Sequence, residues 1–445
     1  MTTPPALLTL ALQSALFAVL TNGYRVVDQY WIQDVSVEAQ GAVGASFFVI
    51  ILYYAAFELI AAGTSPLIAR ATGAGDADLR RRLLGQGLFG VLVMAVLIMV
   101  AGLLLAPHLA GALGLTGETA RQCTLYLRTL SLTVLPIAAT PLVDQTFVSM
   151  GLPRAPMTFH AIALTVNVVL SPALIFGLDW GIVGAAVAST LSYASTSGMG
   201  LILLRRLTGL SLADVRPGPE LRQILKIGGP IALGTALYTL VYWGMLKTSI
   251  SPLGPEVNAA LGIGFSALEG VSWPLTHGLA LATAALVGQH LGAGDVDAAK
   301  ALVRKTVVMS TALGLFISAA FYFGAGPLTG LFTDESAVHL EAIVYAEVLA
   351  ASQLFVAWES LFEGVLSGAG HTRVVFVWSA PLNILRVPLA WWLAHPLGWG
   401  APGVWWAINF TTWVKAIGKG WAVRKGGWAT VGLSPMKAHT ETQAP

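Results

Sequence analysis

Twelve long apolar stretches constrain the fold of this chain more than any other feature. Clusters of glycine, proline or charged residues separate them, and each holds about 20 residues or more, the helical length needed to cross a hydrocarbon core of roughly 30 Å. Of the 445 residues, 56% are hydrophobic and 10% are charged, whereas soluble domains carry about a quarter charged residues. The sequence therefore predicts an all-α integral membrane protein, with transmembrane helices near residues 7–31, 41–66, 83–106, 122–149, 156–177, 181–203, 227–250, 257–287, 302–325, 338–367, 374–395 and 400–423.

Basic residues indicate the orientation of these twelve helices, because short cytoplasmic loops retain Lys and Arg. Basic residues such as Arg80, Arg154 and Arg373 follow even-numbered spans. Others surround the end of the last span, and we assign Lys415 and Lys419 there to the same, cytoplasmic side. The opposite loops carry mainly acidic residues. We therefore expect a multi-pass inner-membrane protein with both termini in the cytoplasm.

An internal repeat divides the chain into two halves. Gly73-Ala74-Gly75-Asp76 recurs as Gly292-Ala293-Gly294-Asp295, 219 positions later, and the same shift pairs Asp144 with Glu363. Because each half holds an even number of spans, both halves enter the membrane in the same sense. This predicts two six-helix lobes related by an axis along the membrane normal, with boundaries at 1–210 for the N-terminal lobe, 211–226 for a cytoplasmic connection, 227–425 for the C-terminal lobe and 426–445 for a cytoplasmic tail.

The repeated Gly-Ala-Gly-Asp element admits two interpretations. A phosphate-binding loop would need a preceding strand and a following Lys, and both are missing from this sequence. The alternative is structural, with the glycines ending one helix and the Asp capping the next. We predict the structural role at both loops.

These motifs together resemble those of the multidrug and toxic compound extrusion (MATE) family. The resemblance rests on the duplicated Gly-Ala-Gly-Asp loops, on the Gly-Leu-Pro-Arg and Gly-His-Thr-Arg turns at 151–154 and 370–373, and on Asn167 to Pro172 followed by the glycine-rich start of the sixth span at 181–186. It covers nearly the whole chain. The resemblance implies two lobes around a central cleft, alternating access, and export of organic cations against an inward flow of Na⁺ or H⁺.

The resemblance also points to candidate ion-coupling residues in the first lobe. Asp28 matches the family's aspartate in the first span, Asn167 its asparagine in the fifth, and Ser189 or Thr190 its hydroxyl partner in the sixth. Ser171 stands where a branch of the family carries a second aspartate, which argues against a two-carboxylate Na⁺ site. From the residues alone, Asp28 could instead be neutralised by Arg25 one turn away, and Asn167 could serve ordinary interhelical hydrogen bonding.

Ionisable residues inside the second lobe give further candidates, because each costs roughly 2.5 to 3.5 kcal/mol at membrane depth. Glu359 and Glu363 lie one helical turn apart, a spacing that favours a coupled, proton-holding pair. The alternative is a simple ion pair of Glu363 with Arg386 or Lys247. We assign Lys247, Glu269, Arg386 and Glu58 to the substrate cleft, and expect Lys247 to pair with Glu269 and Glu58 with Arg25. We interpret Asp144 as structural.

Other classes of function fit the sequence less well. Cys123 is the only cysteine, and His160, His277 and His371 lack metal-ligand spacing, so we expect no metal site and no cofactor beyond Na⁺ or H⁺ as the coupling ion. No basic run suggests nucleic acid, and duplication in one chain favours a transporter over an intramembrane enzyme or a channel. We expect a monomer in a lipid bilayer with a small organic substrate; the alternative is a flippase for lipids or lipid-linked sugars, for which Lys247 and Arg386 would serve.

Overall fold

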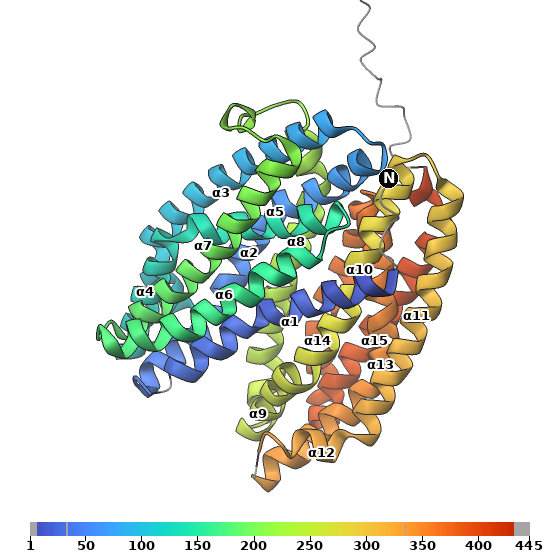
Figure 1. The fold of residues 1–445 in the computed structure, drawn as a ribbon. Helices are drawn as coiled ribbons and strands as arrows, with labels where there is room; N and C mark the ends of the chain where they lie inside the picture. The colour runs from blue at the N-terminus through green and yellow to red at the C-terminus, as the bar shows by residue number, and fades with distance from the viewer. Residues whose placement is uncertain (1–6, 33, 334, 431–445) are drawn as a thin grey trace, which may run out of the picture.

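The computed structural model describes residues 7–32, 34–333 and 335–430. Within these ranges, eight side chains are not described, those of Asn22, Arg25, Val26, Gln29, Val37, Phe48, Ser266 and Ala267. Every regular element in the described residues is helical (Figure 1). The predicted all-α class is therefore confirmed.

The N-terminal lobe contains the first six spans. They are α1 (Leu7–Ile32), α2 (Val37–Gly73), α3 (Ala77–Ala112), the pair α4 (Gly117–Leu132) and α5 (Val134–Ser149), α6 (Arg154–Pro172) and α7 (Gly181–Thr208). The helices α4 and α5 are bent by 62° at a short break and form one broken span. A π-helical segment (Ala173–Gly177) extends α6.

The C-terminal lobe contains the other six spans. They are α8 (Leu221–Met245), the pair α9 (Pro255–Ile263) and α10 (Glu269–Gly292), α11 (Val296–Phe323), α13 (Ser336–Gly368), α14 (Thr372–Ala394) and α15 (Gly400–Arg424), with a short α12 (Ala325–Thr329) after α11. π-helical segments follow α8 (Leu246–Ile250) and α9 (Gly264–Leu268). Because α8 begins at Leu221, the last part of the connection expected at 211–226 is already helical, and a 3-10 turn (Leu212–Asp214) precedes it.

The two Gly-Ala-Gly-Asp loops are helix boundaries, as predicted. The Asp76 carboxylate accepts a hydrogen bond of 2.8 Å from the Leu79 backbone N–H at the start of α3. Asp295 accepts one of 2.9 Å from the Ala298 N–H at the start of α11. Gly75 and Gly294 have φ angles of 71° and 78°, a conformation that glycine adopts without steric cost. Both loops lie at the same end of the bundle, which we call the loop end.

The two lobes contact each other through a symmetric set of four helices. α2 packs along α8, α1 packs along α10, and α2 also contacts α10. Under the 219-residue repeat α1 corresponds to α8 and α2 to α10, so exchanging the lobes reproduces the same pairings. The predicted two-lobe duplication is confirmed, and its axis runs between α2 and α10.

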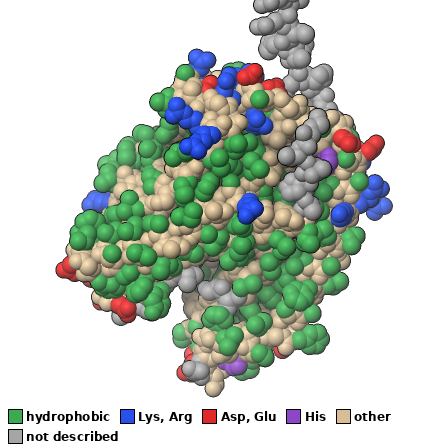
Figure 2. Space-filling view, viewed as in Figure 1, with side chains coloured by type: hydrophobic (Ala, Val, Ile, Leu, Met, Phe, Trp, Pro, Cys, Tyr) green, Lys and Arg blue, Asp and Glu red, His purple; other side chains and the backbone are tan. Residues whose placement is uncertain are grey.

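The lobes meet closely at the loop end and diverge at the other. A Cβ built on Gly73 would overlap the Gln289 carbonyl oxygen, and one on Gly292 would overlap that of Arg70. Two hydrogen bonds also cross between the lobes at this end. The Arg70 guanidinium donates to the Ala369 carbonyl oxygen (2.5 Å), and the Gln289 side-chain amide donates to the Ser149 carbonyl oxygen (2.8 Å). Figure 2 shows the molecule hollowed between the lobes at the opposite end, which we call the cleft end.

Candidate functional site

The first candidate site lies inside the N-terminal lobe, between α1, α6 and α7. Ser189 Oγ on α7 donates a hydrogen bond of 2.5 Å to Asp28 Oδ2 on α1, and Asn167 Nδ2 on α6 lies 3.4 Å from Ser189 Oγ. Ser171 follows Asn167 by one helical turn, and all four side chains are buried. The structure thus places together Asp28, Asn167 and Ser189, with Ser171 beside them on α6.

Three oxygens of this group lack a hydrogen-bond partner among the described residues: Asp28 Oδ1, Asn167 Oδ1 and Ser171 Oγ. A buried polar atom without a partner costs free energy comparable to a lost hydrogen bond. A carboxylate, an amide oxygen and a hydroxyl are also the ligand types that hard cations prefer. The group therefore has the composition to hold either a small cation or a proton on Asp28.

Thr190 is not part of this group. Its hydroxyl contacts Thr133 Oγ1 at 2.8 Å, at the break between α4 and α5, and donates to the Ala186 carbonyl (2.9 Å). Of the two hydroxyls considered in the sixth span, Ser189 is the one that contacts Asp28. The proposed neutralisation of Asp28 by Arg25 falls outside the described side chains.

A second polar chain in the N-terminal lobe was missed from the sequence. The hydroxyl of Tyr24 contacts His160 Nδ1 at 3.1 Å, and His160 Nε2 contacts Asp144 Oδ2 at 2.9 Å. A neutral imidazole satisfies both bonds, with Nε2–H donating to Asp144 and Nδ1 accepting from Tyr24. Tyr193 stacks on Tyr24 with a ring separation of 4.8 Å. The only sequence signal was the cost of burying His160 and Asp144, which does not identify their partners.

Glu58 lies next to this chain. Gln145 is the residue that follows Asp144 on α5. Its Nε2 donates to both carboxylate oxygens of Glu58, at 2.9 and 3.1 Å. The partner predicted for Glu58 was Arg25, whose side chain is not described. The amide of Gln145 therefore links α5 to α2 in the lobe interior.

The glutamate pair of α13 faces two lysines of α15 in the C-terminal lobe. Lys419 Nζ lies 3.0 Å from Glu359 Oε1 and 2.7 Å from Glu363 Oε2, and Lys415 Nζ lies 3.0 Å from Glu359 Oε1. The alternative pairing of Glu363 with Arg386 or Lys247 is therefore wrong. Lys415 and Lys419 are buried. One turn separates the two lysines, as it does the two glutamates, so the two pairs meet across facing sides of adjacent helices.

The other predicted cleft residues do not pair with one another. Tyr345 donates a hydrogen bond of 2.6 Å to Glu269, and Lys247 Nζ lies 5.4 Å from the ring centroid of Trp243. The expected Lys247–Glu269 pair is therefore wrong. The reason is geometric: Glu269 begins α10 and faces α13, whereas Lys247 lies in the π-helical segment after α8.

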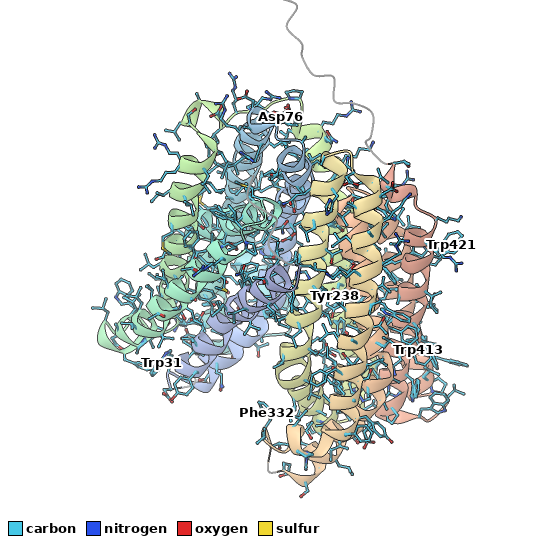
Figure 3. All side chains as sticks on the ribbon, turned by 45° about the vertical axis from the view of Figure 1, so that its right-hand side comes forward. Trp31, Asp76, Tyr238, Phe332, Trp413 and Trp421 are labelled. Atoms are coloured by element: carbon cyan, nitrogen blue, oxygen red, sulfur yellow. The ribbon has the colours of Figure 1, made fainter. Side chains whose placement is uncertain are left out.

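Arg386 is buried on α14 without a carboxylate within salt-bridge distance among the described residues. Its Nε donates to Thr411 Oγ1 (2.9 Å) and its Nη2 to Thr412 Oγ1 (3.3 Å), and its guanidinium carbon lies 5.9 Å from the Tyr242 ring. Tyr242 in turn contacts Tyr238 with ring centroids 4.6 Å apart, and Figure 3 shows Tyr238 near the centre of the molecule. Aromatic surface thus lies beside the only buried guanidinium of the described spans.

A protein-family model for MatE matches residues 14–173 and 230–392, more than half of the chain. The chain belongs to the MatE family. The two matched blocks correspond to the two lobes, in agreement with the internal repeat. The MATE resemblance noted from the sequence motifs is therefore confirmed.

Relatives named for multidrug resistance or export agree with this MatE assignment. The chain is 27% identical over 402 residues to a probable multidrug resistance protein NorM from Bradyrhizobium diazoefficiens, covering 85% of this chain and 84% of the relative. It is 24% identical over 358 residues to the multidrug export protein MepA from Staphylococcus aureus, covering 79% of this chain and 77% of the relative. Both matches span most of each protein, so they involve both lobes.

Solved structures share the fold. A MOP superfamily transporter from Pyrococcus furiosus, described as having a binding pocket of reversed polarity, superposes with a TM-score of 0.86 at 22% identity, covering 94% of this chain and 95% of that one. The outward-facing conformation of a multidrug resistance MATE transporter gives the same TM-score, identity and coverage. At this identity the likeness concerns the fold alone.

The MatE repeat relates one pair of residues of opposite charge, one carboxylate to a histidine, and one carboxylate to another carboxylate. The 219-residue shift places Lys247 at the position of Asp28 and His277 at that of Glu58, while Glu363 corresponds to Asp144. No Lys or Arg with a described side chain pairs with Asp28, Glu58 or Asp144, whereas the C-terminal lobe buries Arg386, Lys415 and Lys419. The two lobes therefore share one fold but differ in the charge of their interiors.

Proposed function

We propose that this protein is a cation-coupled antiporter that exports organic cations by alternating access, with Na⁺ or H⁺ as the coupling ion. Membership of the MatE family and the names of the relatives support multidrug export. The observation that carries the proposal is the buried Asp28 carboxylate, whose Oδ1 atom, with Asn167 Oδ1 and Ser171 Oγ, has no described partner. Such a group holds an ion or a proton in one state and releases it in another.

The arrangement of the lobes supports alternating access. The loop end is closed by symmetric contacts of α2 with α10, while the cleft end is hollowed (Figure 2). The basic residues that follow even-numbered spans gather at the loop end, which we therefore assign to the cytoplasm. In this arrangement the cleft opens away from the cytoplasm, as required of the state that releases an exported substrate.

Coupling requires that the ion and the substrate favour different states. Binding of a cation or proton at Asp28 removes the net charge of that carboxylate and satisfies the unpartnered oxygens. It thereby weakens the attraction of the N-terminal lobe for a cationic substrate. Exchange follows if the ion displaces the substrate in the cleft-open state and leaves in the opposite state.

The charges of the N-terminal lobe favour an organic cation over a phosphate-bearing lipid, while Arg386 and Lys247 of the C-terminal lobe, which contact hydroxyl and aromatic groups, are the residues that a flippase would use. The N-terminal lobe presents Asp28, Glu58 and Asp144, which attract cations and repel phosphate. In the C-terminal lobe Glu359 and Glu363 neutralise Lys415 and Lys419, so these lysines do not form a phosphate site. Tyr238 and Tyr242 offer aromatic faces on which a flat cation can stack.

Replacing Asp28 with Asn tests the proposal, because the amide keeps the volume but removes the charge and the titrating proton. We expect Asp28→Asn to reach the membrane at a normal level and to lose gradient-driven export by about tenfold or more. The measurement is uptake of a fluorescent cation into everted vesicles under separately imposed pH and Na⁺ gradients. The gradient that drives uptake in the unmodified protein identifies the coupling ion.

The matched control is Asp34→Asn, which makes the same change at an exposed position after α1. It should transport at the normal rate. If Asp28→Asn exports as fast as the unmodified protein under either gradient, Asp28 is a structural residue. Accumulation driven by neither gradient in the unmodified protein would also overturn the antiport mechanism.

A further inference from the structure

Two basic hollows flank the end of α15 on the outer side of the C-terminal lobe. The first has a volume of about 290 Å³ and lies between α11 and α15. Lys300, Arg304 and Arg424 contribute three positive charges to it, and Asp297 one negative charge. Its floor includes Trp428, which is 2% exposed and donates from Nε1 to the Val423 carbonyl at 2.9 Å. The 3-10 turn Gly427–Ala429 thus forms one side of an open, positively charged hollow.

The second hollow has a volume of about 330 Å³ and lies between α14 and α15. Arg373 and Lys425 give it two positive charges and it has no acidic lining residue. Lys425 Nζ lies 3.6 Å from the ring centroid of Trp421, and Val377 continues the lining along α14. The hollow is therefore basic at one side and apolar at the other.

Both hollows lie where the apolar outer surface begins. On α11, Val308 is 69% exposed and follows Arg304 by four residues; on α14, Val377 is 57% exposed and follows Arg373 by four. Residues four apart share one helix face. Exposed apolar side chains on the outside of a membrane bundle face lipid, so the basic groups lie at headgroup depth, and Trp421 on the outer side (Figure 3) is of the type that anchors this interface.

The cations of the hollows are available to a ligand. Within the described ranges, Lys300, Arg304, Arg373, Arg424 and Lys425 form no ion pair within 4.0 Å. Elsewhere at the loop end, Arg81 and Arg82 do have carboxylate partners, Asp214 and Glu220. The C-terminal lobe therefore keeps two hollows of net positive charge at the membrane surface.

We propose that these hollows bind the phosphate groups of anionic phospholipids. Arg and Lys at the rim contact the phosphate, and the acyl chains continue along the exposed apolar faces of α11 and α14 beyond Val308 and Val377. Basic pockets between helices are a known way to recognise anionic headgroups. This inference depends on neither the transported substrate nor the coupling ion.

Native mass spectrometry of the purified protein tests the proposal with three probes: phosphatidylglycerol, phosphatidylethanolamine and inorganic phosphate. The unmodified protein should retain phosphatidylglycerol in preference to phosphatidylethanolamine. A Lys300→Gln/Arg304→Gln variant should weaken binding at the first hollow by on the order of 25-fold, about fivefold for each charge removed, so that one phosphatidylglycerol fewer is retained. An Arg373→Gln/Lys425→Gln variant should weaken retention at the second hollow independently.

The matched control is Arg205→Gln/Arg206→Gln, which removes two exposed positive charges at the same end of the bundle but from no hollow. It should leave retention unchanged. An equal loss in this control would mean that general surface charge attracts the lipid. Equal retention of phosphatidylethanolamine, or displacement of phosphatidylglycerol by equimolar inorganic phosphate, would also overturn the proposal.

Discussion

At the scale of single residues, Lys419 illustrates how a charge is retained in the interior of a lobe. Its side chain has no exposed surface, yet its Nζ lies within 3.0 Å of both Glu359 and Glu363. An unpaired ammonium there would carry the full cost of desolvation. Lys419 thus joins α15 to α13 and holds both glutamates through one nitrogen, so the two glutamates share a partner rather than only repelling each other.

Replacing Lys419 with Met should destabilise the protein by about 2 kcal/mol, because it removes the two charge-assisted hydrogen bonds of Lys419 while leaving neither carboxylate both buried and unpaired. Glu359 would keep Lys415, while Glu363, whose side chain is 44% exposed, would keep contact with water. The measurement is the free energy of unfolding in detergent. Lys305→Met, at an exposed position of α11, serves as the control and should cost less than about 1 kcal/mol. Equal costs for the two variants would show that the buried ion pairs contribute nothing net.

At the scale of helices, α2 and α10 form the closure of the loop end. Gly73 on α2 and Gly292 on α10 occupy equivalent positions of the repeat, and each lies against a carbonyl oxygen of the other helix. Only glycine permits this approach, because a Cβ at either position would overlap the neighbouring backbone. The repeat thus builds one contact twice, on both sides of the axis that relates the lobes.

A Gly73→Ala substitution should therefore open the loop end. The added methyl group forces α2 and α10 apart by about 1 Å or more to reach an ordinary contact distance, which favours states in which the loop end is open. Spin labels at positions 78 and 297, in a protein whose Cys123 is replaced, should report a larger population of long distances. Gly229→Ala on α8, where a Cβ has no neighbour within 4 Å, should leave the distribution unchanged. An unchanged distribution in folded Gly73→Ala would refute this role of the crossing.

At the scale of the whole molecule, the duplicated fold fixes which segments share a side of the membrane. Both Gly-Ala-Gly-Asp loops cap helices at the same end, and the lobes diverge at the other (Figure 3, where Asp76 marks the first loop). This arrangement holds for either orientation in the bilayer. From the distribution of Lys and Arg we propose that the loop end faces the cytoplasm.

Single-cysteine labelling tests that orientation. With Cys123 replaced, cysteines at positions 76 and 295 should resist a membrane-impermeant reagent in intact cells and react in everted vesicles. A cysteine at position 34, beyond α1 at the other end, should show the reverse pattern. Labelling of position 76 or 295 from outside intact cells would invert the topology and with it the proposed direction of transport.

The sequence by itself determined the membrane class, the twelve spans, the duplication and the helix-capping role of Asp76 and Asp295. These follow from local properties, because hydropathy and capping act within one segment and a repeat is read along the chain. The boundaries were less certain, as the helical start of α8 within the expected connection shows. The family resemblance added the grouping of Asp28, Asn167 and Ser189, which the folded chain brings together.

Only the tertiary structure decided the partners of the buried charges. The pairing of Lys415 and Lys419 with Glu359 and Glu363 was not predicted, Lys247 was paired with Glu269, and the Tyr24–His160–Asp144 chain was missed. Each of these contacts joins helices that are separate in sequence, so it depends on how each helix is rotated and at what depth it crosses its neighbour. Hydropathy places a residue along a span but does not fix that rotation. It is set by packing of the lobe as a whole, which therefore decides the partner of each buried charge.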